Sequence, residues 1–251
     1  MKYKKTIFLV IILIGVFLIY KLNTNTKVYY LSLGDSLAIG QNPYGEIGYG
    51  YSDYVNKYLK KNNKLKFYSK DFASSGDRIV DLIAKIEKNE KTKLQDEEIT
   101  IQNAISKANV ITLSIGANDL FEKAGLNDMN YNLDKVDETE KYLPEIISNL
   151  DKLLKLIRKY NDDKIILIGY YNPLAPLSSK YTRELEPLFM KVNENYKAVA
   201  ESNGCDYIDV YEIFKENPEY LPNPSDIHPS NTGYEVISDQ IIDILQKNSI
   251  N

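Results

Sequence analysis

Residues 30–40 read YLSLGDSLAIG, a stretch that begins as a buried strand and ends in a short polar turn. The residues before Gly34 favour extended structure, and Gly34, Asp35 and Ser36 then interrupt the apolar run. A serine at such a turn has two common roles, because its hydroxyl can cap a helix or, beside a base, act as a nucleophile.

Four further short runs resemble the strand that precedes this turn. Most of them are continuously apolar instead of alternating, which is typical of strands covered on both faces in a parallel sheet. The five predicted strands are residues 27–33, 64–69, 109–115, 164–170 and 205–211.

Amphipathic helical patterns lie between these strands and after them. The predicted helices are residues 51–61, 77–88, 143–160, 185–202 and 232–247. Because strands and helices alternate, the sequence predicts an α/β fold, a three-layer α/β/α sandwich. No linker or repeat interrupts residues 27–251, so we expect them to form a single domain.

The composition excludes some classes of partner and cofactor. The 251 residues carry a formal net charge of -4, and the lysines alternate with acidic residues, so we expect no nucleic-acid partner. With one cysteine, Cys205, and one histidine, His228, the chain can form neither an intramolecular disulfide nor a zinc site of the Cys/His kind. We expect no metal and no cofactor.

The first 26 residues form a separate segment. Three lysines among the first five residues precede an unbroken apolar run, residues 7–20, which is typical of an export signal. Two interpretations stay open: a cleaved signal peptide, or an uncleaved membrane anchor. No Ala-x-Ala cleavage site follows the run, which favours the anchor. Both interpretations place residues 27–251 outside the cytoplasm, held at the cell membrane or secreted.

The residues that follow the strands are the best candidates for a site, because ligands of open α/β sheets bind at the carboxyl ends of the strands. GDSL at 34–37 follows the first strand, DFASSGDRIVDL at 71–82 follows the second, and GANDL at 116–120 follows the third. PSDIHPSNTGY at 224–234 comes after the fifth strand and contains the only histidine. We therefore expect these elements to meet at one edge of the sheet.

The side chains in these elements suit acyl transfer. A serine hydroxyl needs a base to remove its proton, and His228 is the only imidazole available. A tetrahedral intermediate needs hydrogen-bond donors, and three candidates are the backbone N–H groups of Ser36 and Gly76 and the side-chain amide of Asn118. The sequence predicts Ser36 as the nucleophile, His228 as the general base, and these three donors as the oxyanion hole.

Together the four elements resemble the SGNH, or GDSL, hydrolase family. GDSL at 34–37 is the first signature of that family, and SSGDRIVDL at 74–82 resembles the second. GAND at 116–119 is its third, and DIHPSNTGY at 226–234 resembles the last, which carries the catalytic histidine. The resemblance covers residues 30–234. It implies a flavodoxin-like fold with strand order 2-1-3-4-5 and metal-free hydrolysis of a small-molecule, lipid or cell-wall ester.

One position departs from the family pattern. Family members usually place the third catalytic residue, an acid, three residues before the histidine, where this chain has Ser225; Asp226 lies two residues before His228. In extended chain Asp226 would point away from the ring, whereas a tight turn at 223–229 would bring it onto the imidazole. We favour Asp226 as the residue that orients His228, and a dyad of Ser36 and His228 alone stays open.

Other interpretations of these residues remain. Ser36 alone fits a helix cap, and Asp35 and Asp119 are expected to shape their turns without reacting. The main alternative function is a catalytically idle binding domain on the same fold. Tyr44, Tyr170 and Tyr171 are candidates to line an acyl or sugar pocket, while the acidic residues of the loop at 121–142 favour a solvated rim over an apolar tunnel.

Overall fold

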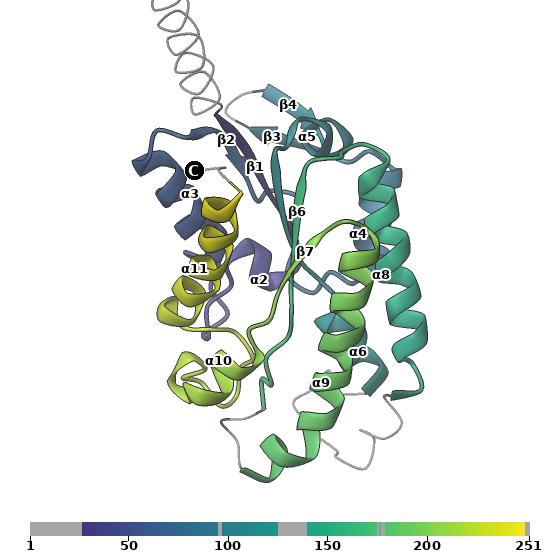
Figure 1. Ribbon diagram of the computed structural model, residues 1–251, viewed down its shortest axis with the longest axis vertical. Helices are drawn as coiled ribbons and strands as arrows, with labels where there is room; N and C mark the ends of the chain where they lie inside the picture. The colour runs from purple at the N-terminus through teal and green to yellow at the C-terminus, as the bar shows by residue number, and fades with distance from the viewer. Residues whose placement is uncertain (1–26, 95–96, 125–139, 175, 177–178, 249–251) are drawn as a thin grey trace, which may run out of the picture.

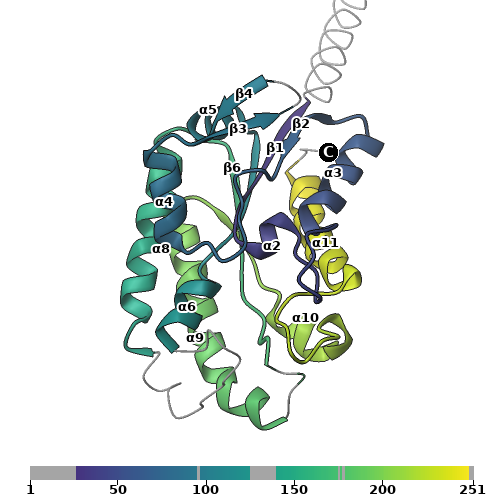
Figure 2. The same cartoon turned by 180° about the vertical axis from the view of Figure 1, so that it is seen from behind.

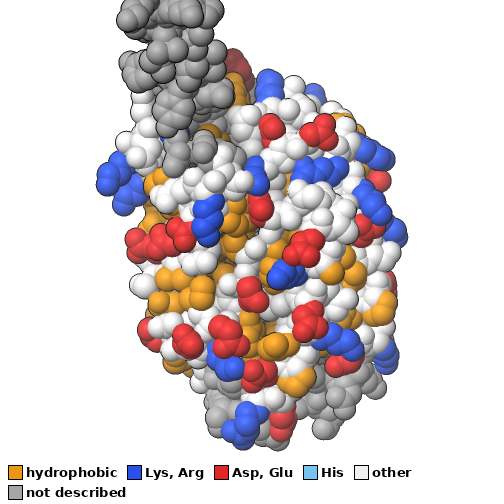
Figure 3. Space-filling view, viewed as in Figure 1, with side chains coloured by type: hydrophobic (Ala, Val, Ile, Leu, Met, Phe, Trp, Pro, Cys, Tyr) orange, Lys and Arg blue, Asp and Glu red, His pale blue; other side chains and the backbone are white. Residues whose placement is uncertain are grey.

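The computed structural model describes residues 27–94, 97–124, 140–174, 176 and 179–248 (Figure 1). The proposed signal or anchor segment lies outside these residues. Within them, no helix is long and apolar enough to cross a membrane. On the face shown in Figure 3, basic and acidic side chains are interspersed, as the alternation of lysines with acidic residues predicted.

A five-stranded parallel sheet forms the middle layer (Figure 1). Its strands are β1 (Val28–Gly34), β2 (Leu65–Ser69), β5 (Val110–Ser114), β6 (Lys164–Ile168) and β7 (Asp206–Ile208). They lie in the order β2-β1-β5-β6-β7, and every neighbouring pair is parallel. For these main strands the order is 2-1-3-4-5, so the predicted fold class and strand order are confirmed.

Both faces of the sheet are buried, which explains the continuously apolar strands. In β1, Leu31 and Leu33 pack into one core, and Val28 and Tyr30 pack into the other. Helices α4 (Ile79–Glu87), α5 (Ile101–Lys107), α8 (Leu143–Arg158) and α9 (Ser179–Ser202) cover the first core. Helices α3 (Tyr51–Lys61) and α11 (Asn231–Lys247) cover the second (Figure 2).

A short helix, α2 (Ser36–Ile39), begins directly after β1. Several other short elements were not predicted. They are the antiparallel pair β3 (Lys91–Leu94) and β4 (Glu97–Thr100), α6 (Ala117–Ala124) and α10 (Tyr211–Glu216). The last predicted strand, residues 205–211, was too long, because β7 ends at Ile208. There the Asp209 carboxylate accepts the N–H of Tyr211 at 2.9 Å and helps to start α10.

Candidate active site

Ser36 is the first residue of α2, at the carboxyl end of β1. The helix is capped by Asp35, whose Oδ1 accepts the N–H of Leu37 at 3.1 Å. Ser36 is therefore not the cap, which removes that interpretation of its hydroxyl. Its backbone N–H has no acceptor among the residues that the structure describes, as expected at the first turn of a helix.

Gly34 is the residue that allows this sharp exit from the sheet. Its φ is +131°, and a Cβ there would lie 1.8 Å from the carbonyl oxygen of Ser114 in β5. The next N–H, of Asp35, donates to the same carbonyl at 2.9 Å. Only glycine fits this contact without moving one strand away from the other.

Asp35, the residue before the nucleophile candidate, is buried. Its Oδ1 also accepts the hydroxyl of Ser114 at 3.3 Å. Burial raises the pKa of Asp35 to about 7, against the lowering effect of its hydrogen bonds. Both contacts hold the turn in shape, which agrees with the structural role predicted for this aspartate.

The second and third sequence elements are joined by hydrogen bonds. The amide of Asn118 donates to the carbonyl of Asp77 at 2.8 Å, which brings Asn118 beside the loop that carries Gly76. The other N–H of that amide remains for an oxyanion. Gly76 has a φ of +84°, and its N–H has no acceptor within the described part of the chain.

Asp119 also links the third sequence element to the second. Its Oδ2 accepts the N–H of Ile79 at 3.0 Å, so a residue of α6 caps the start of α4. Burial raises the pKa of Asp119 to about 6. The prediction that this aspartate fixes the loop is confirmed.

A tight turn brings Asp226 onto His228. The carbonyl of Asn223 accepts the N–H of Asp226 at 3.0 Å, and the Asn223 side chain accepts the N–H of Ser225 at 3.0 Å. Asp226 Oδ1 then lies 2.7 Å from His228 Nδ1 and accepts the His228 N–H at 2.8 Å. Ser225, at the usual position of the acid, is exposed.

This contact defines the chemistry of the imidazole. With Asp226 accepting from Nδ1–H, Nε2 carries the lone pair that can remove a proton. Nε2 is buried and has no hydrogen-bond partner among the described residues. Burial lowers the pKa of His228, and the Asp226 carboxylate partly opposes that effect.

Gln41 also contacts this site, although no motif indicated it. Its Nε2 lies 3.5 Å from His228 Nδ1, and its Oε1 accepts the hydroxyl of Ser75 at 2.6 Å. The Gln41 carbonyl accepts the hydroxyl of Tyr234 at 2.6 Å. Gln41 thus connects the second sequence element to the histidine.

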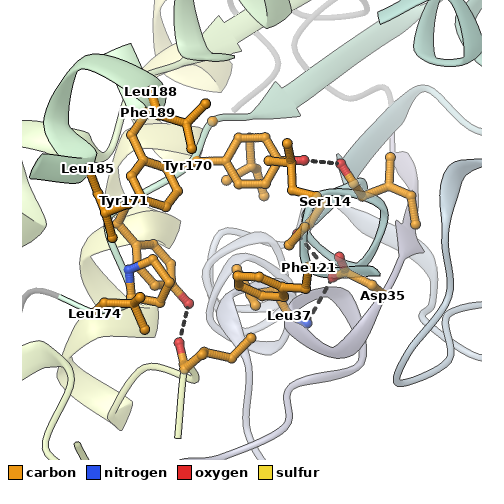
Figure 4. Close-up of a pocket in the computed structure, with 17 residues that line it drawn as sticks. Asp35, Leu37, Ser114, Phe121, Tyr170, Tyr171, Leu174, Leu185, Leu188 and Phe189 are labelled. Carbon is orange, nitrogen blue, oxygen red and sulfur yellow. Dashed lines mark hydrogen bonds between the residues drawn. The ribbon is translucent and has the colours of Figure 1, made fainter. Parts of the chain in front are cut away.

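An apolar pocket adjoins the turn that carries Ser36 (Figure 4). Its apolar lining comprises Leu37, Ile115, Ala117, Leu120, Phe121, Ile168, Tyr170, Tyr171, Pro173, Leu174, Leu185, Leu188, Phe189 and Ile227. Asp35 and Ser114 are the polar and charged side chains of the lining. The space between the walls is about 830 Å³, its open mouth included.

The pocket changes one expectation. Tyr170 and Tyr171 line it as predicted, but Tyr44 is 74% exposed and does not. Most of the acidic loop that favoured a solvated rim, residues 125–139, lies outside the described residues. The apolar wall comes largely from α9 and the loop after β6, and neither carries a motif.

Residues 32–236 match the GDSL-like Lipase/Acylhydrolase family. The chain belongs to this family. It is therefore an ester hydrolase of the group that includes esterases and lipases. Among the described residues, no cluster of three or more His, Cys, Asp or Glu side chains could hold a metal ion.

Individual relatives agree with this membership. The chain is 24% identical to the spore germination lipase LipC of Bacillus licheniformis over 222 aligned positions, and the alignment covers 84% of this chain and 93% of that protein. A lipase from a goat rumen metagenome, Lip_vut3, has a similar fold, with a TM-score of 0.62 and 23% identity over 85% of this chain and 95% of that one. The acetylxylan esterase Axe2 of Geobacillus stearothermophilus has a TM-score of 0.61 and 20% identity over 91% and 96% of the two chains.

The pH dependence tests the pair of His228 and Asp226. Because only neutral imidazole accepts a proton, kcat/KM for p-nitrophenyl butyrate should fall as the pH drops through the pKa of His228, which lies below its ordinary value of 6.5. Asp226→Asn removes the carboxylate that raises this pKa, so the inflection should move to lower pH. The Asp226→Asn substitution should also lower kcat about 10²- to 10⁴-fold.

Ser225→Ala is the matched control, since Ser225 belongs to the same turn and is exposed. It should leave the pH profile unchanged. An Asp226→Asn variant with the kcat and profile of the parent would favour the dyad.

Proposed function

We propose that the domain hydrolyses carboxylic esters with Ser36 as nucleophile, His228 as general base and Asp226 as the residue that orients the imidazole. The N–H groups of Ser36 and Gly76 and the amide of Asn118 form the oxyanion hole. The observation that carries this proposal is the 2.7 Å contact between His228 Nδ1 and Asp226 Oδ1. It leaves Nε2 as the basic nitrogen, as in the serine hydrolases.

The reaction follows from these roles. Ser36 Oγ attacks the ester carbonyl, and His228 Nε2 takes the proton of the Ser36 hydroxyl as it does so. The three donors stabilise the oxyanion of the tetrahedral intermediate, and the imidazolium then protonates the leaving alcohol. Water hydrolyses the acyl-enzyme by the same route, which releases the acid and restores the serine.

The apolar pocket supports an acyl group longer than acetyl. Burial of each CH₂ group contributes about 0.8 kcal/mol, so an apolar lining favours a longer aliphatic chain. LipC and Lip_vut3 are named as lipases, and Axe2 as an acetylxylan esterase. The pocket walls agree better with the first two, and we propose a lipid or another long-chain acyl ester as the substrate.

The proposed location is outside the cytoplasmic membrane. Its support is the lysine-flanked apolar run at residues 7–20. Since β1 starts at Val28 and Ser36 follows its other end, an anchor would be attached at the sheet edge opposite the site, about 20 Å away along the strand. The site would then face away from the membrane that holds the anchor.

Ser36→Ala tests the nucleophile and the alternative of an idle binding domain. The purified full chain in detergent should hydrolyse p-nitrophenyl butyrate, and the variant should lose about 10³-fold or more of kcat because no other group replaces the hydroxyl. A fluorophosphonate should label the parent at Ser36. Ser106→Ala, on the exposed surface of α5, is the control and should retain activity.

A Ser36→Ala variant as active as the parent would contradict the assignment. A parent that neither hydrolyses esters nor reacts with the fluorophosphonate would favour the binding domain.

A series of p-nitrophenyl esters from acetate to dodecanoate tests the pocket. We expect kcat/KM to rise from acetate to the medium chains, by up to about fourfold for each CH₂ that is buried. Leu188→Trp should reduce the pocket and lower octanoate hydrolysis more than acetate hydrolysis. Met190→Trp, 44% exposed on the same helix, should change neither. Acetate as the preferred substrate of the parent would contradict the proposal.

Protease treatment of intact cells tests the location. A tagged full chain should be degraded from outside, while a cytoplasmic protein with the same tag stays intact. A full-length chain in the membrane fraction would support the anchor, and a shortened chain in the medium would support a cleaved signal. Protection of the domain until the cells are lysed would contradict both.

A further inference from the structure

One partly buried lysine, Lys85, contacts the loop around Gly76 at three points. Lys85 lies in α4, and its Nζ donates to the hydroxyl of Ser74 at 2.7 Å and to the carbonyl of Phe72 at 3.4 Å. Its third contact is an ion pair with Asp77 Oδ2. An ammonium group has three N–H donors, so this loop supplies an acceptor for each of them.

The ion pair is shielded from water. The side chains of Lys85 and Asp77 are 15% and 13% exposed, whereas those of Lys91 and Glu98 in the β3–β4 pair are 59% and 57% exposed. A shielded pair is screened less by salt and solvent, and therefore restrains its partners more strongly than a surface pair does.

Gly76 has no side chain through which other elements could hold it. A Cβ built on Gly76 would meet no atom within 4 Å. The position of its N–H therefore depends on the rest of the loop, in which Ser74 and Ser75 precede it and Asp77 follows it. Lys85 contacts Ser74 and Asp77.

Three other contacts hold the same loop against the site. The N–H of Ser74 donates to the carbonyl of Gly34 at 3.2 Å, the hydroxyl of Ser75 donates to Gln41 Oε1 at 2.6 Å, and the carbonyl of Asp77 accepts the amide of Asn118. These bonds link the loop to the elements that carry Ser36 and Asn118. Lys85 links the loop to α4.

We propose that Lys85 is a positioning residue for the oxyanion hole. It holds Ser74 and Asp77, and thereby keeps the N–H of Gly76 aligned with the N–H of Ser36 and the side-chain amide of Asn118. This role rests on the proposed function of Gly76. An oxyanion donor stabilises the transition state only when it is already in place, and a displacement of about 1 Å can cost about 10²-fold in rate.

Lys85→Met tests the proposal, since it keeps the aliphatic stem of the side chain and removes the ammonium group. With p-nitrophenyl butyrate we expect kcat to fall about 10- to 100-fold. KM should stay within about twofold, because the acyl pocket is not touched. Lys85→Arg, which keeps the charge, should recover part of the lost kcat.

Lys164→Met is the matched control. Lys164 forms a partly buried pair with Asp206 at 2.6 Å, at the amino ends of β6 and β7 and therefore at the sheet edge opposite the site. Its loss should lower the melting temperature without lowering kcat. A fall of kcat as large as that of Lys85→Met would indicate a general loss of stability and would overturn the proposal.

Two further variants separate positioning from folding. Asp77→Asn keeps the carbonyl that binds Asn118 but weakens the ion pair, so it should lower kcat in the same direction even if Lys85→Met does not fold. If Lys85 acts through the oxyanion hole, Asn118→Ala should cost less in the Lys85→Met background than in the parent.

The outcomes distinguish this proposal from the one on which it rests. A parent that does not hydrolyse the ester would overturn the proposed function and the role of Lys85 with it. An active parent with Lys85→Met and Asp77→Asn variants that keep the kcat of the parent would overturn only the role of Lys85.

Discussion

The close approach of Gly34 to the carbonyl of Ser114 is the constraint on which the site depends. It requires a residue without a side chain at the end of β1, in a backbone conformation that other residues rarely adopt. The chain then leaves the sheet at once, and Asp35 is left in position to cap α2. Ser36 consequently stands at a helix start, with its hydroxyl free of the capping role and its N–H free of an intrahelical acceptor.

The other parts of the site are held to this turn by contacts between loops. Asn118 and Asp119 each bind the loop and helix that follow β2, one through the carbonyl of Asp77 and the other through the N–H of Ile79. In the last sequence element, Asn223 accepts hydrogen bonds within the turn before His228 and also donates to the carbonyl of Pro43 at 2.7 Å. Each loop is thus fixed by a neighbour from a different part of the sequence.

Burial gives these polar groups different properties. It raises the pKa of Asp35 and Asp119, which serve as hydrogen-bond acceptors for backbone N–H groups. It lowers the pKa of His228, which keeps the imidazole neutral and able to accept a proton at neutral pH. The same desolvation therefore shifts the pKa of the aspartates and of the histidine in opposite directions, because it disfavours the charged form of each.

The sequence by itself determined the layered α/β fold, the strand order through the family resemblance, and the candidates Ser36, Gly76, Asn118 and His228. Those features depend on local patterns: apolar runs, helical periods and short motifs. The position of Asp226 was left open because it depends on a turn that Asn223 stabilises. Lys85, Gln41 and the apolar pocket were missed, since each is defined by contacts between segments that are distant in the sequence. Only the tertiary structure decides such contacts, because a side chain's partners there depend on how strands and helices pack and not on its neighbours along the chain.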